Sequence, residues 1–133
     1  MFMKKVVTFG VFDLLHIGHF RLFERCKKLG DYLIVAVHSD KYVRINKPNC
    51  NLYYDEKTRI EMISAIKYVD ETILYNQIDE MIKNIDFDVL VVGPDQTNPH
   101  FINAINYVKS IGKEVVVLSR TKNVSSTELR KIK

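Results

Sequence analysis

The sequence predicts one α/β domain over residues 1–133, with a doubly wound, five-stranded parallel sheet flanked by helices on both faces. Two patterns support this prediction. Short apolar runs rich in Val and Ile alternate with segments in which apolar side chains recur every three or four positions. The runs are typical of strands buried on both faces, and the spaced pattern is typical of amphipathic helices. Strands and helices that alternate along a chain form βαβ units with right-handed crossovers.

The elements can be assigned in order from these patterns. The expected strands are residues 6–10, 32–37, 71–74, 89–92 and 115–118, and the expected helices are 17–29, 56–66, 78–85, 101–111 and 125–132. Between the second strand and the second helix lies a polar stretch, residues 39–55, which contains proline and several asparagines. We expect this stretch to be irregular, and long irregular segments in small domains are often functional loops.

Composition excludes several classes of protein. The net charge of +4 is modest, and lysines are interleaved with acidic residues, so a nucleic-acid-binding stripe is not expected. The sequence has neither a secretory signal pattern nor an apolar run long enough to cross a bilayer, so we expect a cytoplasmic protein without membrane association. Cys26 falls on the apolar side of the first helix and Cys50 in the polar stretch, and no disulfide is expected.

The most informative segment is residues 6–19. An apolar strand ends at Gly10, a turn follows, and a helix begins at a His16-x-Gly18-His19 motif. A strand, a glycine turn and a helix N-terminus together form an anion site from backbone N–H groups and the helix dipole. Two imidazoles at the same place add hydrogen-bond donors for a phosphate, and fixed donors stabilise the charge that develops during phosphoryl transfer.

A metal site is the main alternative for these two histidines, besides an incidental surface position. Two histidines alone make a poor zinc site, and the other candidate ligands are scattered along the chain. We therefore expect no metal held by the protein itself. These other candidates are Cys26, His38, Cys50 and His100.

Further polar segments follow the later strands. Residues 120–127, Arg-Thr-Lys-Asn-Val-Ser-Ser-Thr, either cap the last helix or, with Arg120, hold a polyphosphate. Asp13 either orients a histidine or stabilises the turn. Asp95, after Gly93-Pro94, either accepts a hydrogen bond from a base amine or ends a turn.

Three cations lie in or after the polar stretch. Arg44 and Lys47 belong to residues 39–55, and Arg59 lies at the start of the next helix. They can close over a negatively charged ligand, although each alone is more often a surface charge.

The chain resembles the cytidylyltransferase branch of the HxGH nucleotidyltransferases, and within it the bacterial glycerol-3-phosphate cytidylyltransferases. The likeness covers residues 6–131 and is carried by residues 8–19, 30–37, Arg59, 67–71 and 120–127. It implies a Rossmann-like sheet, a homodimer, and CTP bound with Mg²⁺. It also implies the reaction, in which an acceptor phosphate attacks the α-phosphorus of CTP and pyrophosphate leaves.

The resemblance also implies roles for particular residues. His16, His19, Lys47 and Arg120 would be catalytic, and Arg44, Arg59 and Lys67 would belong to the acceptor site or the loop. The nucleotide-binding residues would be Phe9, Gly10, Val11, Phe12, His16, His19, Gly93, Asp95, Arg120, Thr121, Ser125, Ser126 and Thr127.

This chain departs from the family pattern in a few places. Val11 replaces the hydroxyl residue of a Gly-Thr-Phe-Asp turn, Gly93-Pro94-Asp95-Gln96 replaces Gly-Asp-Asp-Trp, and Lys67 replaces an arginine. The chain also contains no tryptophan. These changes lie at the base and acceptor end, so the acceptor stays open between a glycerol 3-phosphate-like or other surface-polymer precursor phosphate, an amino-alcohol phosphate, and an amino-acid-derived phosphate such as phosphoglutamine.

The nucleotide and the class of protein leave alternatives as well. ATP is the rival to CTP, because the same HxGH machinery serves both nucleotides. A non-catalytic nucleotide-binding module is the alternative to an enzyme, and the intact histidine and Ser/Thr motifs disfavour it.

Overall fold

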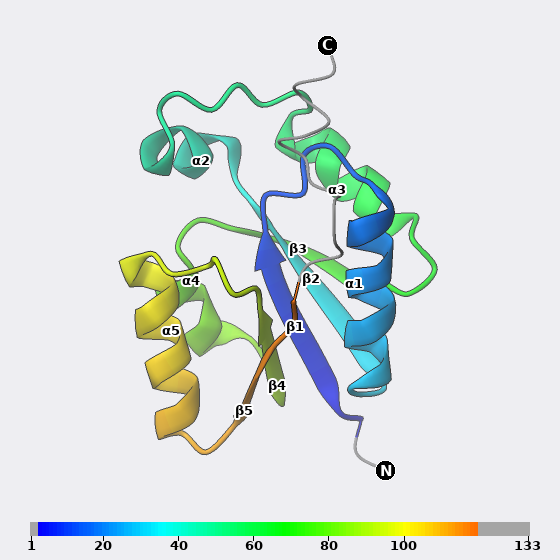
Figure 1. Cartoon of the computed structure of the whole chain (residues 1–133), viewed down its shortest axis with the longest axis vertical. Coiled ribbons are helices and arrows are strands. Elements are labelled where there is room, and N and C mark those ends of the chain that lie inside the picture. Colours follow the sequence, from blue (N-terminus) through cyan, green and yellow to red (C-terminus); the bar gives the residue numbers. More distant parts are fainter. Residues whose placement is uncertain (1–2, 120–133) are drawn as a thin grey trace.

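A computed structural model describes residues 3–119 of the chain. Its sheet is entirely parallel, with the strand order β3-β2-β1-β4-β5 (Figure 1). The strands are β1 (Lys5–Gly10), β2 (Tyr32–His38), β3 (Glu71–Tyr75), β4 (Val89–Val92) and β5 (Glu114–Val117). The predicted five-stranded parallel sheet is confirmed, and the strand ends differ from the prediction by at most one residue.

The helices cover both faces of this sheet. They are α1 (Ile17–Lys28), α2 (Asp40–Asn46), α3 (Glu56–Ser64), α4 (Ile78–Met81), the 3₁₀ helix η1 (Ile82–Asn84) and α5 (Pro99–Ser110). Helices α1 and α3 pack on one face, and α4, η1 and α5 pack on the other. The winding direction therefore switches between β1 and β4, and ligands of such sheets bind beyond the carboxyl ends of the strands at this switch point.

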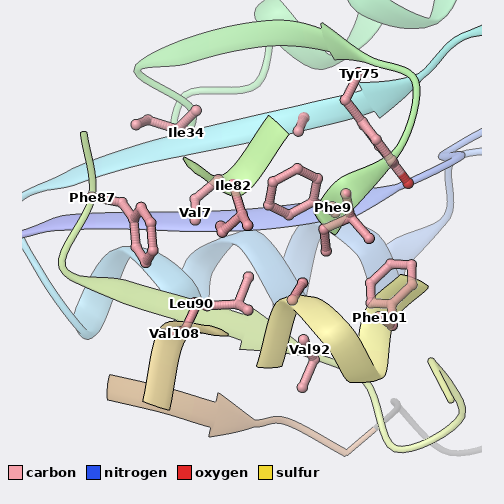
Figure 2. Close-up of a cluster of buried hydrophobic side chains, with 13 residues drawn as sticks. Val7, Phe9, Ile34, Tyr75, Ile82, Phe87, Leu90, Val92, Phe101 and Val108 are labelled. Carbon is pink, nitrogen blue, oxygen red and sulfur yellow. The ribbon is translucent and has the colours of Figure 1, made fainter. Parts of the chain in front are cut away.

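Strand β1 shows how the two cores arise. Val7 and Phe9 point into the core under α4 and α5, whereas Val6 points into the core under α1 and α3, because side chains alternate along a strand. Figure 2 shows the first of these cores, in which Phe9 lies near Phe101 of α5. Burying one large apolar side chain contributes about 1.5–3 kcal/mol. Both cores together hold the ends of β1 and β4 in place.

The stretch 39–55 is not irregular throughout, so that prediction is wrong for residues 40–46. These residues form α2, and the Ser39 hydroxyl caps it by accepting a hydrogen bond from Tyr42 N at 3.4 Å. Val43 is the only fully buried residue of α2. A helix of two turns with one buried side chain is too short to show the apolar repeat on which the prediction relied.

The predicted helix over residues 78–85 is present as two shorter pieces. α4 ends at Met81, and η1 continues from Ile82 with tighter 3₁₀ geometry. Ile78 and Ile82 are both buried, so the apolar spacing identified the correct face. The predicted helix over 125–132 lies outside the described residues. Among the helices that are described, none is long and apolar enough to span a membrane.

Candidate active site

The carboxyl ends of the strands open into a cavity of about 640 Å³. The turn after β1, the ends of β2 and β3, the loop 93–98 and the start of α5 line it. Nine of the residues predicted to be catalytic or nucleotide-binding lie on its wall: Phe9, Gly10, Val11, Phe12, His16, His19, Lys47, Gly93 and Asp95. The structure therefore brings the two main predicted segments together at the point where the sheet changes direction.

The two motif histidines form the first turn of α1. His16 is the N-cap, and its Nδ1 accepts a hydrogen bond from Gly18 N at 3.0 Å. His19 reaches back, and its Nδ1 accepts a hydrogen bond from His16 N at 3.2 Å. This is a reciprocal capping box in which imidazoles take the places of the usual Ser/Thr and Glu/Gln side chains. The ring centroids lie 4.0 Å apart.

The capping bonds determine which nitrogen of each ring can donate. Because Nδ1 of each ring receives a backbone N–H, a neutral ring carries its proton on Nε2. His16 and His19 therefore both offer an Nε2–H group on the wall of the cavity. They do so at the positive end of α1, whose first turn contains no acidic residue. This arrangement can bind the oxygens of a phosphate and stabilise additional negative charge on them.

The turn between β1 and α1 supports the His19 ring. Phe12 has a φ of 53°, in the left-handed region, which costs a non-glycine residue about 1–2 kcal/mol. Its ring folds back over Gly10, where an added Cβ would lie only 2.7 Å from Phe12 Cζ. The Phe12 ring then meets His19 edge-on at 5.7 Å and Phe23 at 5.3 Å. The strained turn thus packs an aromatic ring behind the imidazole.

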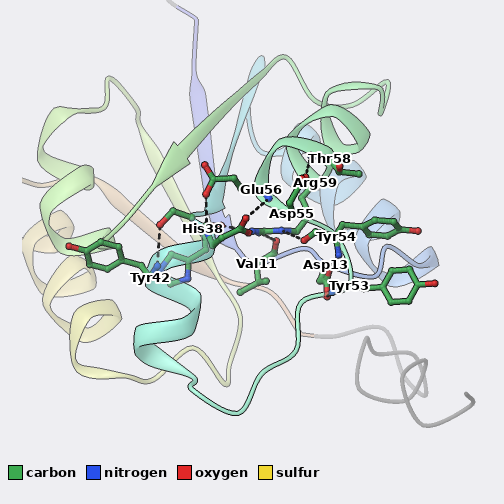
Figure 3. A network of polar contacts seen from close by, with 12 residues as sticks. Val11, Asp13, His38, Tyr42, Tyr53, Tyr54, Asp55, Glu56, Thr58 and Arg59 are labelled. Atoms are coloured by element: carbon green, nitrogen blue, oxygen red, sulfur yellow. Dashed lines mark hydrogen bonds and ion pairs between the residues drawn. The ribbon is translucent and has the colours of Figure 1, made fainter.

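Asp13 holds the segment that follows α2. Its carboxylate is buried, with Oδ2 accepting from Tyr53 N at 2.7 Å and Oδ1 accepting from Tyr54 N at 2.8 Å (Figure 3). Of the two sequence interpretations of Asp13, these bonds favour the structural one, and they join the histidine turn to residues 47–55.

Arg59 does not face the cavity, and the expectation that it closes over an anionic ligand is wrong for this structure. Its side chain is completely buried, and Figure 3 shows it within a network of polar contacts. The guanidinium donates to Val11 O at 2.8 Å, His38 O at 2.9 Å, Tyr54 O at 3.1 Å and Asp40 Oδ1 at 2.5 Å. Four oxygens from three segments of the chain satisfy the cation, so its charge stabilises the protein around the site.

Two other cations of the sequence analysis also lie elsewhere. Arg44 and Lys67 are exposed, and neither is on the described wall of the cavity. Lys67 Nζ lies 5.0 Å from the centroid of the neighbouring Tyr68 ring. The residues predicted within 120–127 lie outside the described part of the chain. Ser119 lines the cavity, and its carbonyl accepts from Arg25 Nη1 at 2.9 Å.

Gln96 is a site residue that the sequence reasoning did not identify. Its Nε2 donates to Phe9 O at 2.8 Å, and its Oε1 accepts from Gly93 N at 2.8 Å. The side chain therefore ties the end of β1 to the end of β4 across the switch point. The contact with Gly93 spans three residues, so it could have been predicted from the sequence. Nothing in the sequence indicated the contact with Phe9.

His38 forms part of the wall at the end of β2. It is mostly buried, stacks on Tyr75 with a centroid distance of 4.5 Å, and its Nε2 lies 2.8 Å from Asn76 O. Burial lowers the pKa of His38 below its ordinary value, although the hydrogen bond to Asn76 opposes the shift. His38 is therefore neutral at physiological pH.

The described residues contain no group of three or more His, Cys, Asp or Glu side chains that could hold a metal ion. Cys26 is buried, and burial raises its pKa to about 12. Cys50 is partly exposed on the cavity wall. Both thiols are free.

A doubly wound parallel sheet with two imidazole donors at a helix N-terminus defines a Rossmann-like protein built for phosphoryl chemistry. Comparison with protein families agrees with this class. Residues 7–132 match the family model described as cytidylyltransferase-like. The chain belongs to this family and is a nucleotidyltransferase.

Comparison with individual relatives also indicates a nucleotidyltransferase. The chain is 36% identical over 131 residues to glycerol-3-phosphate cytidylyltransferase of Staphylococcus aureus, covering 96% of this chain and 93% of the relative. It is 43% identical over 95 residues to FAD synthase of Thermococcus kodakarensis, covering 69% and 63%. A crystal structure of the lipopolysaccharide core biosynthesis protein of Thermoplasma volcanium superposes with a TM-score of 0.74 at 31% identity, covering 92% of this chain and 99% of that one.

Proposed function

We propose that the protein transfers CMP from CTP to a small phosphorylated acceptor and releases pyrophosphate. The observation that carries this proposal is the pair of Nε2–H donors of His16 and His19 at the head of α1. The relative from Staphylococcus aureus, a glycerol-3-phosphate cytidylyltransferase by name, supports both CTP and a polyol phosphate acceptor.

In the proposed reaction, an acceptor phosphate oxygen forms a bond to the α-phosphorus of CTP. The bond from that phosphorus to the oxygen bridging to the β-phosphate breaks, and pyrophosphate carries away its electron pair. His16 and His19 donate to the α-phosphate oxygens, where negative charge increases in the transition state. Lys47, which lines the cavity after α2, adds positive charge near the phosphates. Arg120 and the hydroxyls of residues 121–127 complete the proposed set.

Mg²⁺ is proposed to enter with the triphosphate, whose charge it neutralises. Mg²⁺ commonly takes ligands from phosphates and water with one or two carboxylates, and does not need a cage made by the protein. Asp95 places one carboxylate on the cavity wall, which fits this mode. The test is whether EDTA abolishes pyrophosphate release and whether added Mg²⁺ restores it.

The acceptor and the base are the finer parts of this proposal. Candidates for the acceptor are glycerol 3-phosphate, an amino-alcohol phosphate and an amino-acid-derived phosphate. ATP remains the second candidate nucleotide, since the relative from Thermococcus kodakarensis is an FAD synthase by name and FAD contains an adenine nucleotide. We also propose that the protein is a cytoplasmic homodimer, as the family resemblance implies. Sedimentation equilibrium measures the mass of the assembly and so tests the dimer.

A substrate screen tests the proposal directly. The protein is incubated with Mg²⁺, each of CTP and ATP, and each phosphorylated acceptor, while pyrophosphate is measured and products are identified by mass. We expect a CMP-linked product. Nucleotide transfer only from ATP would overturn the choice of CTP, and no transfer with any pair would overturn the proposed activity.

Two variants test the histidines without disrupting the helix cap. His16→Asn keeps an oxygen that can cap α1 but loses the Nε2 donor, since Asn is a favourable N-cap residue. His19→Gln removes the second Nε2 donor but keeps an oxygen that can accept from His16 N, since Gln is a usual residue at this position of a capping box. We expect kcat to fall about 10²–10³-fold in each, the usual effect of removing one such donor. Arg21→Ala, on the exposed side of the same helix, is the control. Nearly unchanged kcat in both histidine variants would exclude the proposed role.

A further inference from the structure

One wall of the cavity has no role in the description above. It is formed by the segment after β3 and by the loop leading into α5, and we call it the α5 wall. Figure 1 shows α5 and α1 starting on opposite sides of the end of β1, so this wall faces the histidine pair across the cavity. The name covers the five polar residues of this wall that have no role above, Asn76, Gln77, Thr97, Asn98 and His100, and leaves out Asp95 and Gln96 of the same loop.

The reaction geometry assigns this wall to the acceptor. In phosphoryl transfer the attacking and leaving oxygens lie roughly in line on opposite sides of the phosphorus. The segment proposed to hold the leaving pyrophosphate follows Ser119, which is bonded to Arg25 of α1. Because the histidine donors and Ser119 both lie on the α1 side, we infer that pyrophosphate leaves towards Ser119 and that the acceptor approaches from the side of the α5 wall.

His100 is held in a fixed orientation on this wall. Its Nδ1 lies 3.0 Å from Asp79 Oδ2, which also accepts from Asn103 Nδ2 at 3.3 Å. Burial acts to raise the pKa of Asp79, but the hydrogen bonds from His100 and Asn103 outweigh it and keep the pKa below its ordinary value. Because Asp79 is ionised at neutral pH, Nδ1 of His100 carries a proton. Nε2 is then the acceptor atom of the neutral ring.

The carboxylate of Asp79 is costly in this position. Its Oδ1 is buried and has no hydrogen-bond partner among the described residues. A buried oxygen without a partner costs about 1–3 kcal/mol, and each such group calls for an explanation. The side chain as a whole is 21% exposed and lies in the first turn of α4, where the helix dipole favours an acid, but this helix has only four residues. Its contact with His100 gives the carboxylate a second role, which is to orient the imidazole.

The chemistry of the α5 wall defines what it can bind. Its side chains are amides, a hydroxyl and an imidazole, and no Lys or Arg lies on this wall in the described part of the chain. Such groups bind neutral hydrogen-bonding substituents in preference to a second phosphate. We propose that His100, positioned by Asp79, accepts a hydrogen bond from a hydroxyl group of the acceptor at the end remote from its phosphate. This assignment rests on the transferase activity proposed above.

The test separates binding of the acceptor from chemistry. Initial rates are measured for wild type, His100→Ala and Asp79→Asn with acceptors that differ by one hydroxyl. For His100→Ala we expect an acceptor KM about tenfold higher, the effect of about 1.4 kcal/mol, with kcat and the KM for CTP within about threefold of wild type. Asp79→Asn should raise the same KM less, because the ring is retained but loses its orientation. Ile102→Ala, an exposed position of the same helix, is the control.

The acceptor that lacks the critical hydroxyl gives the decisive comparison. Wild type should bind it about tenfold less well than the full acceptor, and His100→Ala should not discriminate between the two. An unchanged acceptor KM in His100→Ala, or discrimination that survives the substitution, would overturn the role of His100 alone. Absence of transfer by the wild-type enzyme would overturn the transferase proposal and this one with it.

Discussion

The buried guanidinium of Arg59 offers a sharp test of how the site is held together. Replacing Arg59 with Met keeps much of the side-chain volume and removes the charge and all five donors. Three carbonyl oxygens then lose the Arg59 donor, and the Asp40 carboxylate keeps only its hydrogen bond from Glu56 N. Removing one member of a buried ion pair typically destabilises a protein by about 3–5 kcal/mol. The Asp40 side chain is 17% exposed and can recover some hydration, so we expect about 3 kcal/mol.

Urea denaturation measures this loss. With a typical m-value of about 2 kcal/mol/M, a loss of 3 kcal/mol moves the midpoint down by about 1.5 M while the slope stays constant. Total stabilities are about 5–15 kcal/mol, so the variant should still fold. Arg59→Lys, which keeps the charge but reaches fewer of the four oxygens, should fall between wild type and Arg59→Met.

A matched surface substitution provides the control. Lys4 and Glu114 form an ion pair of 3.7 Å in which both side chains are about half exposed. Lys4→Met should therefore change the free energy of unfolding by less than about 0.5 kcal/mol. If Arg59→Met moved the urea midpoint no more than Lys4→Met, the claim that Arg59 stabilises the site would be refuted.

Two further predictions concern Gln96 and the cysteines. Gln96→Ala removes the connection between the ends of β1 and β4. It should raise the KM for CTP about tenfold and the KM for the acceptor by less. Equal KM values for CTP in wild type and variant would contradict this. At pH 8 iodoacetamide should modify Cys50 and spare Cys26, whose pKa of about 12 leaves almost no thiolate. Mass spectrometry should then find one adduct in the native protein and two in urea, and two native adducts would be inconsistent with a buried Cys26.

Most of the fold could be predicted because its information is local. Strands buried on both faces are continuous apolar runs, and the residues of β2 and β4 show this pattern directly. The longer helices repeat their apolar spacing over three turns, as in α5. Helix α2 was not predicted because it buries only Val43. Helices α4 and η1 were predicted as one helix because Ile78 and Ile82 keep the same helical spacing across the change of geometry.

In the candidate site, too, local contacts could be predicted from the sequence and distant contacts could not. The capping bonds of His16 and His19 span two or three residues, so the motif itself predicted them to lie together. Arg59 reaches Val11, 48 residues away, and Gln96 reaches Phe9, 87 residues away. Arg59, near a predicted loop, was interpreted as a ligand contact, whereas its partners are three carbonyl groups and the Asp40 carboxylate, which no sequence pattern reveals.

The histidine at the N-cap of α1 indicates a chemical role for this position, because other residues would stabilise the helix end better. Ser, Thr, Asp and Asn cap helices best, and any of them at position 16 would satisfy the Gly18 N–H. These shorter side chains would not place a hydrogen-bond donor as far into the cavity as the Nε2 atom of histidine, and Asp would also repel a phosphate. An imidazole accepts at Nδ1 and donates at Nε2, on opposite sides of one rigid ring. His16 therefore departs from the best capping residue where a phosphate-binding site needs a second functional atom, as proteins commonly do at functional positions.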